Sequence, residues 1–293
     1  MGRNMLRTLA ALCLLGCVSA QAQSPVWAIH GAHNTVYLAE SVHLLKPGHS
    51  QLPAAFDRAY ATAKTLVMEI DLSRLEESQL QSWMLEHGTF KDQMTLQQAI
   101  GEQRYQRLTA EASRLGLPLE TLQQFEPWAV ALTLADLEYL KLGYDPEQGV
   151  EQQLERRATQ DRKEMRGLET LEEQLGQLER LSYEQQGRFL EMTVDEMRDA
   201  EKDTDELLAA WRAGDNRRLA DLMSDEYESF PELYRALVSE RNRHWLPQIE
   251  QFLKDDHDYL VVVGALHLVG KDGLLDLMRR DGFTPAPVLA APR

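Results

Sequence analysis

The sequence predicts an α+β fold in which strands from both ends of the chain form one mixed β-sheet around a large helical insert. Three apolar runs rich in β-branched residues predict buried strands, at residues 37–43, 66–71 and 261–267. Each run ends in an ionisable residue, and ligands gather at the carboxyl ends of strands in such folds. Because the last strand must pair with the first two, we expect the fold to close by contact between the chain ends.

The N-terminal third alternates strands and helices. Residues 27–29 and 35–42 flank turn-forming residues and predict a hairpin that opens the sheet. Residues 53–63 predict a helix before the strand 66–70, and residues 75–116 carry apolar side chains at helical intervals typical of two or three helices. Residues 127–135 are ambiguous and predict either a buried strand or the start of a helix.

The middle of the chain predicts helices, beginning with a long one after the turn at residues 143–146. Its apolar face is marked by Leu154, Ala158, Met165, Leu168, Leu171, Leu175, Leu178 and Leu181. Further helices are expected over residues 194–211, 217–223 and 232–253. A strand at 259–263, a glycine-rich turn at 264–270 and a helix at 273–280 complete the chain, and no fixed-period repeat appears. We therefore expect one domain over residues 23–293.

Residues 1–22 have the features of an export signal. Arg3 and Arg7 precede an apolar run at residues 9–18 and a small-residue site that ends at Ala22. We expect cleavage after Ala22 and an exported protein, periplasmic or secreted. The Leu-Leu-Gly-Cys sequence that ends at Cys17 resembles a lipoprotein processing box, which leaves a lipid anchor on Cys17 open. No segment reaches the ~20 apolar residues that spanning a bilayer requires, so no transmembrane segment is expected.

Charge and cysteine content narrow the partners. The formal net charge of −16 argues against nucleic acid or an anionic membrane as a partner, because either polyanion would be repelled. Both cysteines, Cys13 and Cys17, lie inside the predicted signal, so the mature chain is expected to lack disulfides and thiolate sites. A metal in the mature chain would need ligands from His, Asp and Glu.

A series of short motifs follows in order along nearly the whole mature chain. It consists of Trp27, Val36-Tyr37-Leu38, Ser41-Val42-His43, residues 68–72, Pro127-Trp128, residues 143–146, Gly149, Leu168-Glu169, Gln174, Trp211, Gly214-Asp215, Arg241-Asn242, Trp245, residues 263–265, His267-Leu268, Gly270, Gly273-Leu274 and Gly282. This series resembles the TraB/GumN family, relatives of the Tiki metalloproteases. The resemblance implies a Tiki-like or erythromycin-esterase-like mixed sheet with helices. It also implies metal-dependent hydrolysis of a peptide or ester-like substrate, by two G-x-x-H motifs and a glutamate.

Carried onto this chain, the family pattern is nearly complete. The second G-x-x-H motif is intact as Gly264 and His267, and the acidic residue is Glu69. The first motif departs from the pattern, because Glu40 stands where the family has glycine before His43. A glycine there permits close backbone approach, so Glu40 either narrows the site or adds a ligand. A catalytically inactive envelope scaffold or binding protein with the same fold therefore remains the alternative.

Two imidazoles and a carboxylate suit a divalent metal such as Zn²⁺, Mn²⁺ or Co²⁺ that keeps one position open for water. The expected metal ligands are His43, His267 and Glu69, and the metal-bound water would attack a carbonyl carbon. Glu69 as a general base rather than a ligand is equally compatible with the sequence. Arg241 is the expected partner of Glu69, and either orients it or binds an anionic group of the substrate.

Other polar residues have simpler interpretations. Glu169 is interpreted as part of a solvated helix face, and Asp145 as a turn or cap residue. The remaining histidines are interpreted as surface residues: His30, His33, His49, His87, His244 and His257. No G-x-S-x-G elbow, H-E-x-x-H motif, Walker loop or dinucleotide fingerprint is present. The non-enzymatic alternative would use the acidic surface of residues 151–191 to capture a partner.

Overall fold

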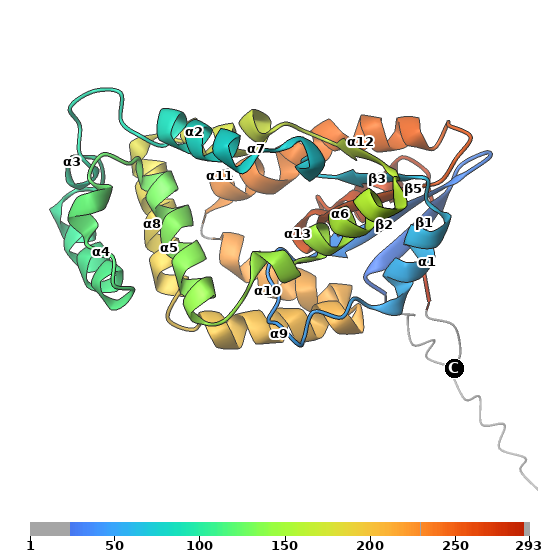
Figure 1. Cartoon of the computed structure of the whole chain (residues 1–293), viewed down its shortest axis with the longest axis horizontal. Helices are drawn as coiled ribbons and strands as arrows, with labels where there is room; N and C mark the ends of the chain where they lie inside the picture. The colour runs from blue at the N-terminus through green and yellow to red at the C-terminus, as the bar shows by residue number, and fades with distance from the viewer. Residues whose placement is uncertain (1–23, 229, 290–293) are drawn as a thin grey trace, which may run out of the picture.

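One mixed six-stranded sheet, in the order β4-β3-β5-β2-β1-β6, organises the structure (Figure 1). The computed structural model describes residues 24–228 and 230–289. The predicted export signal, with Cys13 and Cys17, lies outside these residues. The α+β fold class predicted from the sequence is confirmed.

The two ends of the chain meet in the centre of the sheet, as expected. The hairpin β1 (Val26–His30) and β2 (Thr35–Ser41) is antiparallel, and β5 (Tyr259–Gly264) lies parallel to β2. On its other side β5 pairs in parallel with β3 (Thr65–Met68). The short β6 (Ala286–Pro287) closes the far edge against β1. The predicted hairpin and the pairing of N- and C-terminal strands are both confirmed.

Helices cover both faces of this sheet. The side chains of β5 are apolar on both faces, so both faces have to be shielded from water. Leu260 and Val262 pack with α1 (Ala54–Thr62) and α6 (Val150–Asp161). Val261 and Val263 pack on the other face with α12 (Glu240–Phe252) and α14 (Leu274–Arg280). All four side chains are fully buried. A strand buried on both faces reads as a continuous apolar run, which is why this one was recognisable in the sequence.

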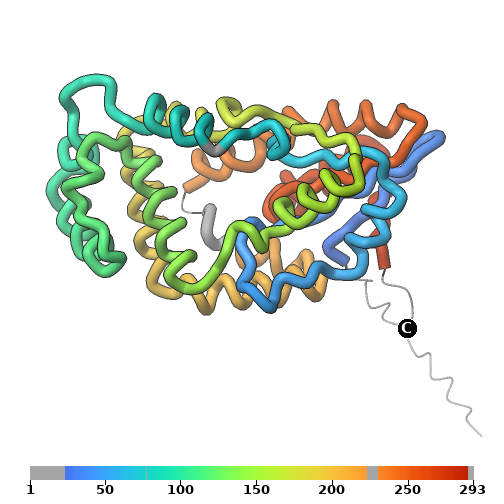
Figure 2. The backbone as a smooth tube through the Cα atoms, viewed as in Figure 1, coloured from blue at the N-terminus to red at the C-terminus, as the bar shows by residue number. Residues whose placement is uncertain are grey.

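The helical insert builds a separate core around Trp128, which is fully buried. Figure 2 shows the green and yellow segments of residues 96–141 and 183–196 at one end of the molecule, with the blue and red strands at the other. The ambiguous residues 127–135 are helical, with Pro127 in the first turn, where its missing N–H costs no hydrogen bond. None of the helices in the described ranges is long and apolar enough to cross a membrane. The other helices are α2 (Glu77–His87), α3 (Leu96–Ile100), α4 (Glu102–Arg114), α5 (Pro127–Lys141), α7 (Leu171–Glu179), α8 (Tyr183–Glu196), α9 (Ala200–Ala213), α10 (Asn216–Glu228), α11 (Pro231–Tyr234) and α13 (Ala265–Leu268), with a π-helical turn at Arg235–Ser239.

The predicted long helix through residues 154–181 is wrong. Helix α6 ends at Asp161, and Arg162 adopts a left-handed conformation with φ 55°. The chain then forms β4 (Glu164–Gly167), which pairs in parallel with β3, and a capping box at Thr170 starts α7. The regularly spaced leucines are divided between the helices α6 and α7, and the strand β4 lies between these helices in the sequence. The sheet consequently receives one strand from the middle of the chain, which the sequence did not predict. The helix expected over 194–211 is also interrupted, between α8 and α9.

Candidate functional site

Four parallel strands end along one edge of the sheet, and each is followed by a polar residue or a glycine of the candidate site. His43 follows β2, Gly264 ends β5, Glu69 directly follows β3, and Glu169 follows β4. The carboxyl edge of a parallel sheet is the common location of sites in α/β architectures. The strand order places these residues side by side although they are far apart in sequence.

Three residues predicted from the sequence converge on Gly264. A Cβ atom built on Gly264 would lie 3.3 Å from Glu69 Oε1, 3.6 Å from His267 Cδ2 and 3.7 Å from His43 Nε2. The absence of a side chain at this position therefore leaves the space that the three groups share. The convergence of His43, Glu69 and His267 is the geometry that the two sequence motifs suggested.

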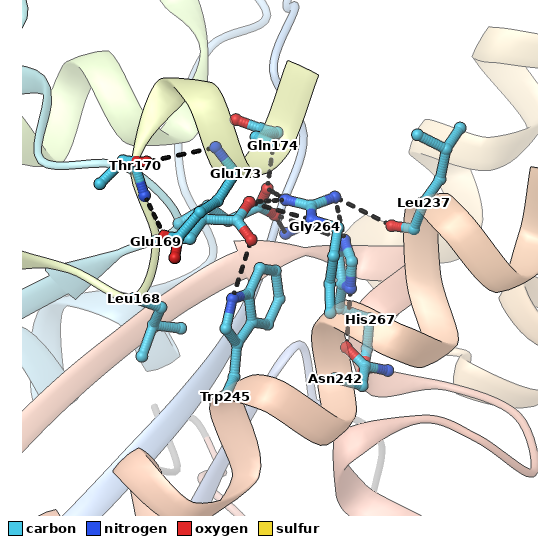
Figure 3. A network of polar contacts seen from close by, with 12 residues as sticks. Leu168, Glu169, Thr170, Glu173, Gln174, Leu237, Asn242, Trp245, Gly264 and His267 are labelled. Carbon is cyan, nitrogen blue, oxygen red and sulfur yellow. Dashed lines mark hydrogen bonds and ion pairs between the residues drawn. The ribbon is translucent and has the colours of Figure 1, made fainter. Parts of the chain in front are cut away.

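Arg241, from α12, is the hub of a buried polar network. Figure 3 shows the labelled members Glu169, Gln174 and His267 of this network. Its Nε and Nη2 donate to Glu169 Oε1 at 2.9 and 2.6 Å, and Nη2 also donates to Glu69 Oε2 at 2.5 Å. Its Nη1 donates to the carbonyl of Leu237 at 2.9 Å and faces His267 Nε2 at 3.1 Å. A guanidinium has five N–H donors, and all of them have partners here. Arg241 therefore orients its neighbours and has no donor left for a substrate.

Glu69 is held on both carboxylate oxygens. Its Oε1 accepts from the Gly264 N–H at 2.7 Å, and its Oε2 accepts from Gln174 at 3.1 Å as well as from Arg241. Burial opposes ionisation of this carboxyl. The neighbouring His267, Arg241 and His43, with the Gly264 N–H, outweigh burial and lower the pKa of Glu69 to about 2. Glu69 is therefore an anion with fixed geometry at any physiological pH.

His267 is a buried, neutral imidazole. Its Nδ1 lies 2.7 Å from Asn242 Oδ1, which can only accept, so Nδ1 carries the proton and Nε2 accepts from Arg241. The ring packs against Trp245 with centroids 4.5 Å apart. Burial, with Arg241 and His43 nearby, lowers the pKa of His267 to about 3 despite the attraction of Glu69.

His43 is the accessible titratable group of the cluster. Its side chain is 66% exposed, and its Nδ1 forms an ion pair at 2.8 Å with Oε1 of Glu151, whose side chain is 12% exposed. The Glu151 carboxylate raises the pKa of His43 to about 9 against the opposing effect of desolvation, and solvent around the exposed part of the ring screens some of that attraction. With Nδ1 on Glu151, Nε2 is the nitrogen directed to Gly264.

The start of α6 fixes Glu151 relative to His43. The Val150 N–H donates to the Val42 carbonyl at 3.1 Å. A Cβ on Gly149 would come within 2.2 Å of the His43 carbonyl oxygen, so only glycine permits this approach. The loop after β2 and the first turn of α6 are thus joined through their backbones. His43 is oriented by a carboxylate that is itself held in place.

Sequence reasoning was wrong about Glu169. Its side chain is 3% exposed, binds Arg241 and accepts from Trp245 Nε1 at 3.1 Å, so it belongs to the network and not to a solvated face. The error followed from the wrong long helix, because Glu169 precedes α7 and lies beyond β4. The Thr170 to Glu173 capping box, a T-x-x-E pattern, was the sequence signal that marked this helix start. Glu151 and Asn242 were also missed as site residues.

Glu40 adds no ligand to the cluster of His43, Glu69 and His267. Its side-chain hydrogen bond is made to a residue outside this cluster. Its side chain is fully buried, and Oε1 accepts from Asn216 Nδ2 of α10 at 2.6 Å. Its Oε2 has no hydrogen-bond partner among the residues that the structure describes. Burial raises the pKa of Glu40 to about 8, although the Asn216 hydrogen bond opposes this shift.

The remaining polar residues mostly follow the sequence interpretation. Asp145 accepts from the Glu147 N–H at 2.9 Å and so caps a short turn, as expected. His30, His33, His49 and His244 are exposed, as predicted. His87 and His257 are half-buried instead, because His87 stacks on Trp83 and His257 packs on Tyr259.

The arrangement does not fit the predicted metal as it stands. Within the described ranges, no group of three or more His, Cys, Asp or Glu side chains is placed to hold an ion. Arg241 occupies the lone pair of His267 Nε2, and both oxygens of Glu69 are already hydrogen-bonded. An ion would have to displace a buried guanidinium. Binding of a divalent metal by these residues stays a prediction.

The fold and the site define an α+β protein with a His-Glu-Arg cluster at the carboxyl edge of a mixed sheet. The model of the TraB/PrgY/gumN family matches residues 25–287, so this chain belongs to that family. It is similar to the uncharacterized protein YbaP of Escherichia coli (strain K12), with 24% identity over 257 residues that cover 83% of this chain and 87% of the relative. YbaP of Shigella flexneri matches with the same identity and coverage. No solved structure matches.

Proposed function

We propose that this protein is a hydrolase of peptide or ester-like bonds in which His43 moves the proton of the attacking water. The observation that supports the proposal is the pairing of the exposed His43 with the half-buried Glu151 at 2.8 Å, with Nε2 turned to the cluster around Gly264. An imidazole held through Nδ1 by a carboxylate is the arrangement that general bases use in hydrolases.

The proposed step conserves atoms and charge. Neutral His43 takes a proton from water through Nε2, and the oxygen of that water bonds to the carbonyl carbon of the substrate. The imidazolium then returns the proton to the leaving nitrogen or oxygen as its bond to carbon breaks. Glu151 stabilises the imidazolium formed between these two events. Since its pKa is raised, His43 is increasingly available as a base as the pH rises toward about 9.

The buried network would serve as a rigid support. Arg241 is hydrogen-bonded to Glu69 and His267, Glu69 also to the Gly264 N–H and His267 also to Asn242, which fixes the wall that a substrate would meet beside His43. A preorganised polar wall stabilises developing charge without having to rearrange. A metal-dependent variant of the reaction is a separate proposal, and it requires an ion to displace Arg241 from His267 Nε2 and Glu69 Oε2.

Export is likewise proposed from residues 1–22, and would place the substrate in the cell envelope or outside it. The test of that proposal is fractionation of cells that express the full chain, with N-terminal sequencing of the product. A mature protein beginning at Gln23 supports cleavage by signal peptidase. Retention of Met1 in the cytoplasm contradicts export.

The test of the hydrolase proposal is turnover of p-nitrophenyl acetate and of fluorescein-labelled casein by the full mature chain. His43→Ala should reduce turnover at least ~100-fold, the low end of what general base catalysis contributes. His49→Ala is the matched control, because His49 is an exposed histidine outside the cluster. Equal loss in both variants would contradict the role of His43. A wild-type protein inert to both substrates would favour the alternative, a scaffold or binding protein with this fold.

A further inference from the structure

The outer edge of β4 is one of the two edges of the sheet. β4 is the terminal strand of the sheet and pairs with β3 on its inner side. The Leu168 N–H donates to the Met68 carbonyl at 2.9 Å, so alternation along the strand turns the N–H and C=O of Arg166 toward β3. The same alternation turns the peptide groups of Met165 and Gly167 outward. Within residues 24–228 and 230–289, these outward groups have no backbone partner.

A cavity of about 760 Å³ lies beside this edge. Met165 and Gly167 line it from β4, Gln248 lines it from α12, and Thr170 lines it from the start of α7. Proteins usually cover or distort the edges of their sheets, because free peptide groups invite pairing with another chain. Here the outward groups of β4 border a cavity large enough for a ligand.

We propose that this cavity binds an extended peptide, which adds to the sheet as a further strand beside β4. The outward N–H and C=O groups of Met165 and Gly167 are complementary to the main chain of such a peptide. The charged side chains at the cavity are largely neutralised within the chain, because Arg166 pairs with Glu164 at 2.8 Å and Asp71 pairs with Arg74 at 3.0 Å. Recognition is therefore through the main chain and tolerates many sequences.

Glu169 connects this cavity to the candidate site. It lines the cavity, and its Oε1 accepts two hydrogen bonds from Arg241, which also holds Glu69. Neighbouring strands lie ~4.8 Å apart, so a peptide beside β4 lies about 19 Å from β2, which His43 follows. About six further extended residues cover that distance at ~3.3 Å each. The inference deepens the proposed function by placing a peptide substrate on the edge of β4, and it rests on that function for the cleavage step alone.

The test measures binding rather than turnover. The probe is a fluorescein-labelled eight-residue peptide of alternating Thr and Val, titrated by anisotropy against the full mature chain carrying His43→Ala, so that the probe stays intact. Met165→Pro removes an outward N–H and keeps the β3 ladder, since that N–H is not part of it. Met165→Ala is the matched control, because it shortens the side chain and keeps the N–H. We expect Met165→Pro to weaken binding at least about fivefold, the effect of one lost hydrogen bond, and Met165→Ala to change it less than about twofold.

A second measurement keeps the inference testable if the proline variant fails to fold. The same peptide with N-methyl groups at alternate residues cannot complete the ladder of hydrogen bonds with β4. It should bind the chain that keeps Met165 at least about fivefold more weakly than the unmodified peptide does. Equal affinity for the two peptides, or no binding of the unmodified peptide at millimolar protein, overturns the inference. Neither result affects the p-nitrophenyl acetate test of His43, so failure of the docking site and failure of the hydrolase proposal are distinguishable.

Discussion

The Arg241 guanidinium bridges two carboxylates, because its Nη2 lies 2.6 Å from Glu169 Oε1 and 2.5 Å from Glu69 Oε2. All three side chains are at most 8% exposed. The bridge joins the strand ends of β3 and β4 to helix α12, so the shape of the site depends on one buried cation. Such clusters are costly to break, because each lost partner leaves a charge without compensation.

Replacing Arg241 with Met should therefore destabilise the protein by about 3–5 kcal/mol, since two buried carboxylates lose their shared partner. Urea unfolding followed by circular dichroism measures the change. Arg243→Met is the matched control on the same helix, because the Arg243 side chain is 57% exposed, and it should cost less than about 1 kcal/mol. Similar losses in the two variants would show that the Arg241 network contributes little to stability.

Gly264→Ala should reduce activity without introducing backbone strain. The backbone at Gly264 has φ −50° and ψ 140°, which alanine adopts readily. The new methyl group, however, would fill the space between Glu69 Oε1 and His43 Nε2, at 3.3 and 3.7 Å. We expect a loss of at least about tenfold in kcat/KM, corresponding to about 1.4 kcal/mol of transition-state binding. An active variant with unchanged kcat/KM would place the reaction elsewhere.

Glu40 makes stability depend on pH. Its pKa is raised from 4.5 to about 8 in the folded chain, so the unfolded chain ionises first as the pH rises. The contribution of Glu40 is fully present below pH 4.5 and is lost progressively up to about pH 8, where the folded form also ionises. The free energy of unfolding of the wild type should therefore fall from pH 5 to pH 8 relative to Glu40→Gln, which keeps an acceptor for Asn216. Parallel pH curves for the two proteins in urea titrations would refute this.

Activity should survive removal of divalent metal, because Arg241 already occupies His267 Nε2 and the proposed step uses protein groups alone. The measurement is turnover of p-nitrophenyl acetate after dialysis against EDTA, with metal content determined by mass spectrometry. Loss of turnover that Mn²⁺, Zn²⁺ or Co²⁺ restores would instead support the metal site expected from the family resemblance.

The sequence predicted the strands that build the site better than the contacts that surround it. β2, β3 and β5 were recognisable because buried strands are apolar and β-branched, and each led to a residue of the cluster. β4 has the sequence Glu-Met-Arg-Gly, with one large apolar side chain, so it resembles the neighbouring helices more than a buried strand.

The acidic members of the site were hidden for a different reason. Glu151 and Glu169 are surrounded in sequence by exposed glutamates, and composition does not separate them from these neighbours. What separates them is a partner in space: His43 for Glu151, and Arg241, which is 72 residues away, for Glu169. Burial of a carboxylate depends on such tertiary contacts, which sequence periodicity does not reveal.

The most direct test of the account is the pH dependence of kcat/KM in the wild type and in Glu151→Gln. Turnover of p-nitrophenyl acetate should rise with pH along a limb set by the pKa of His43, which Glu151 raises to about 9. In Glu151→Gln this limb should move toward 6.5, the ordinary value for histidine, because the carboxylate that favours the imidazolium is gone. A limb at the same pH in both proteins would contradict the assignment of His43 and Glu151 as the proton-transferring pair.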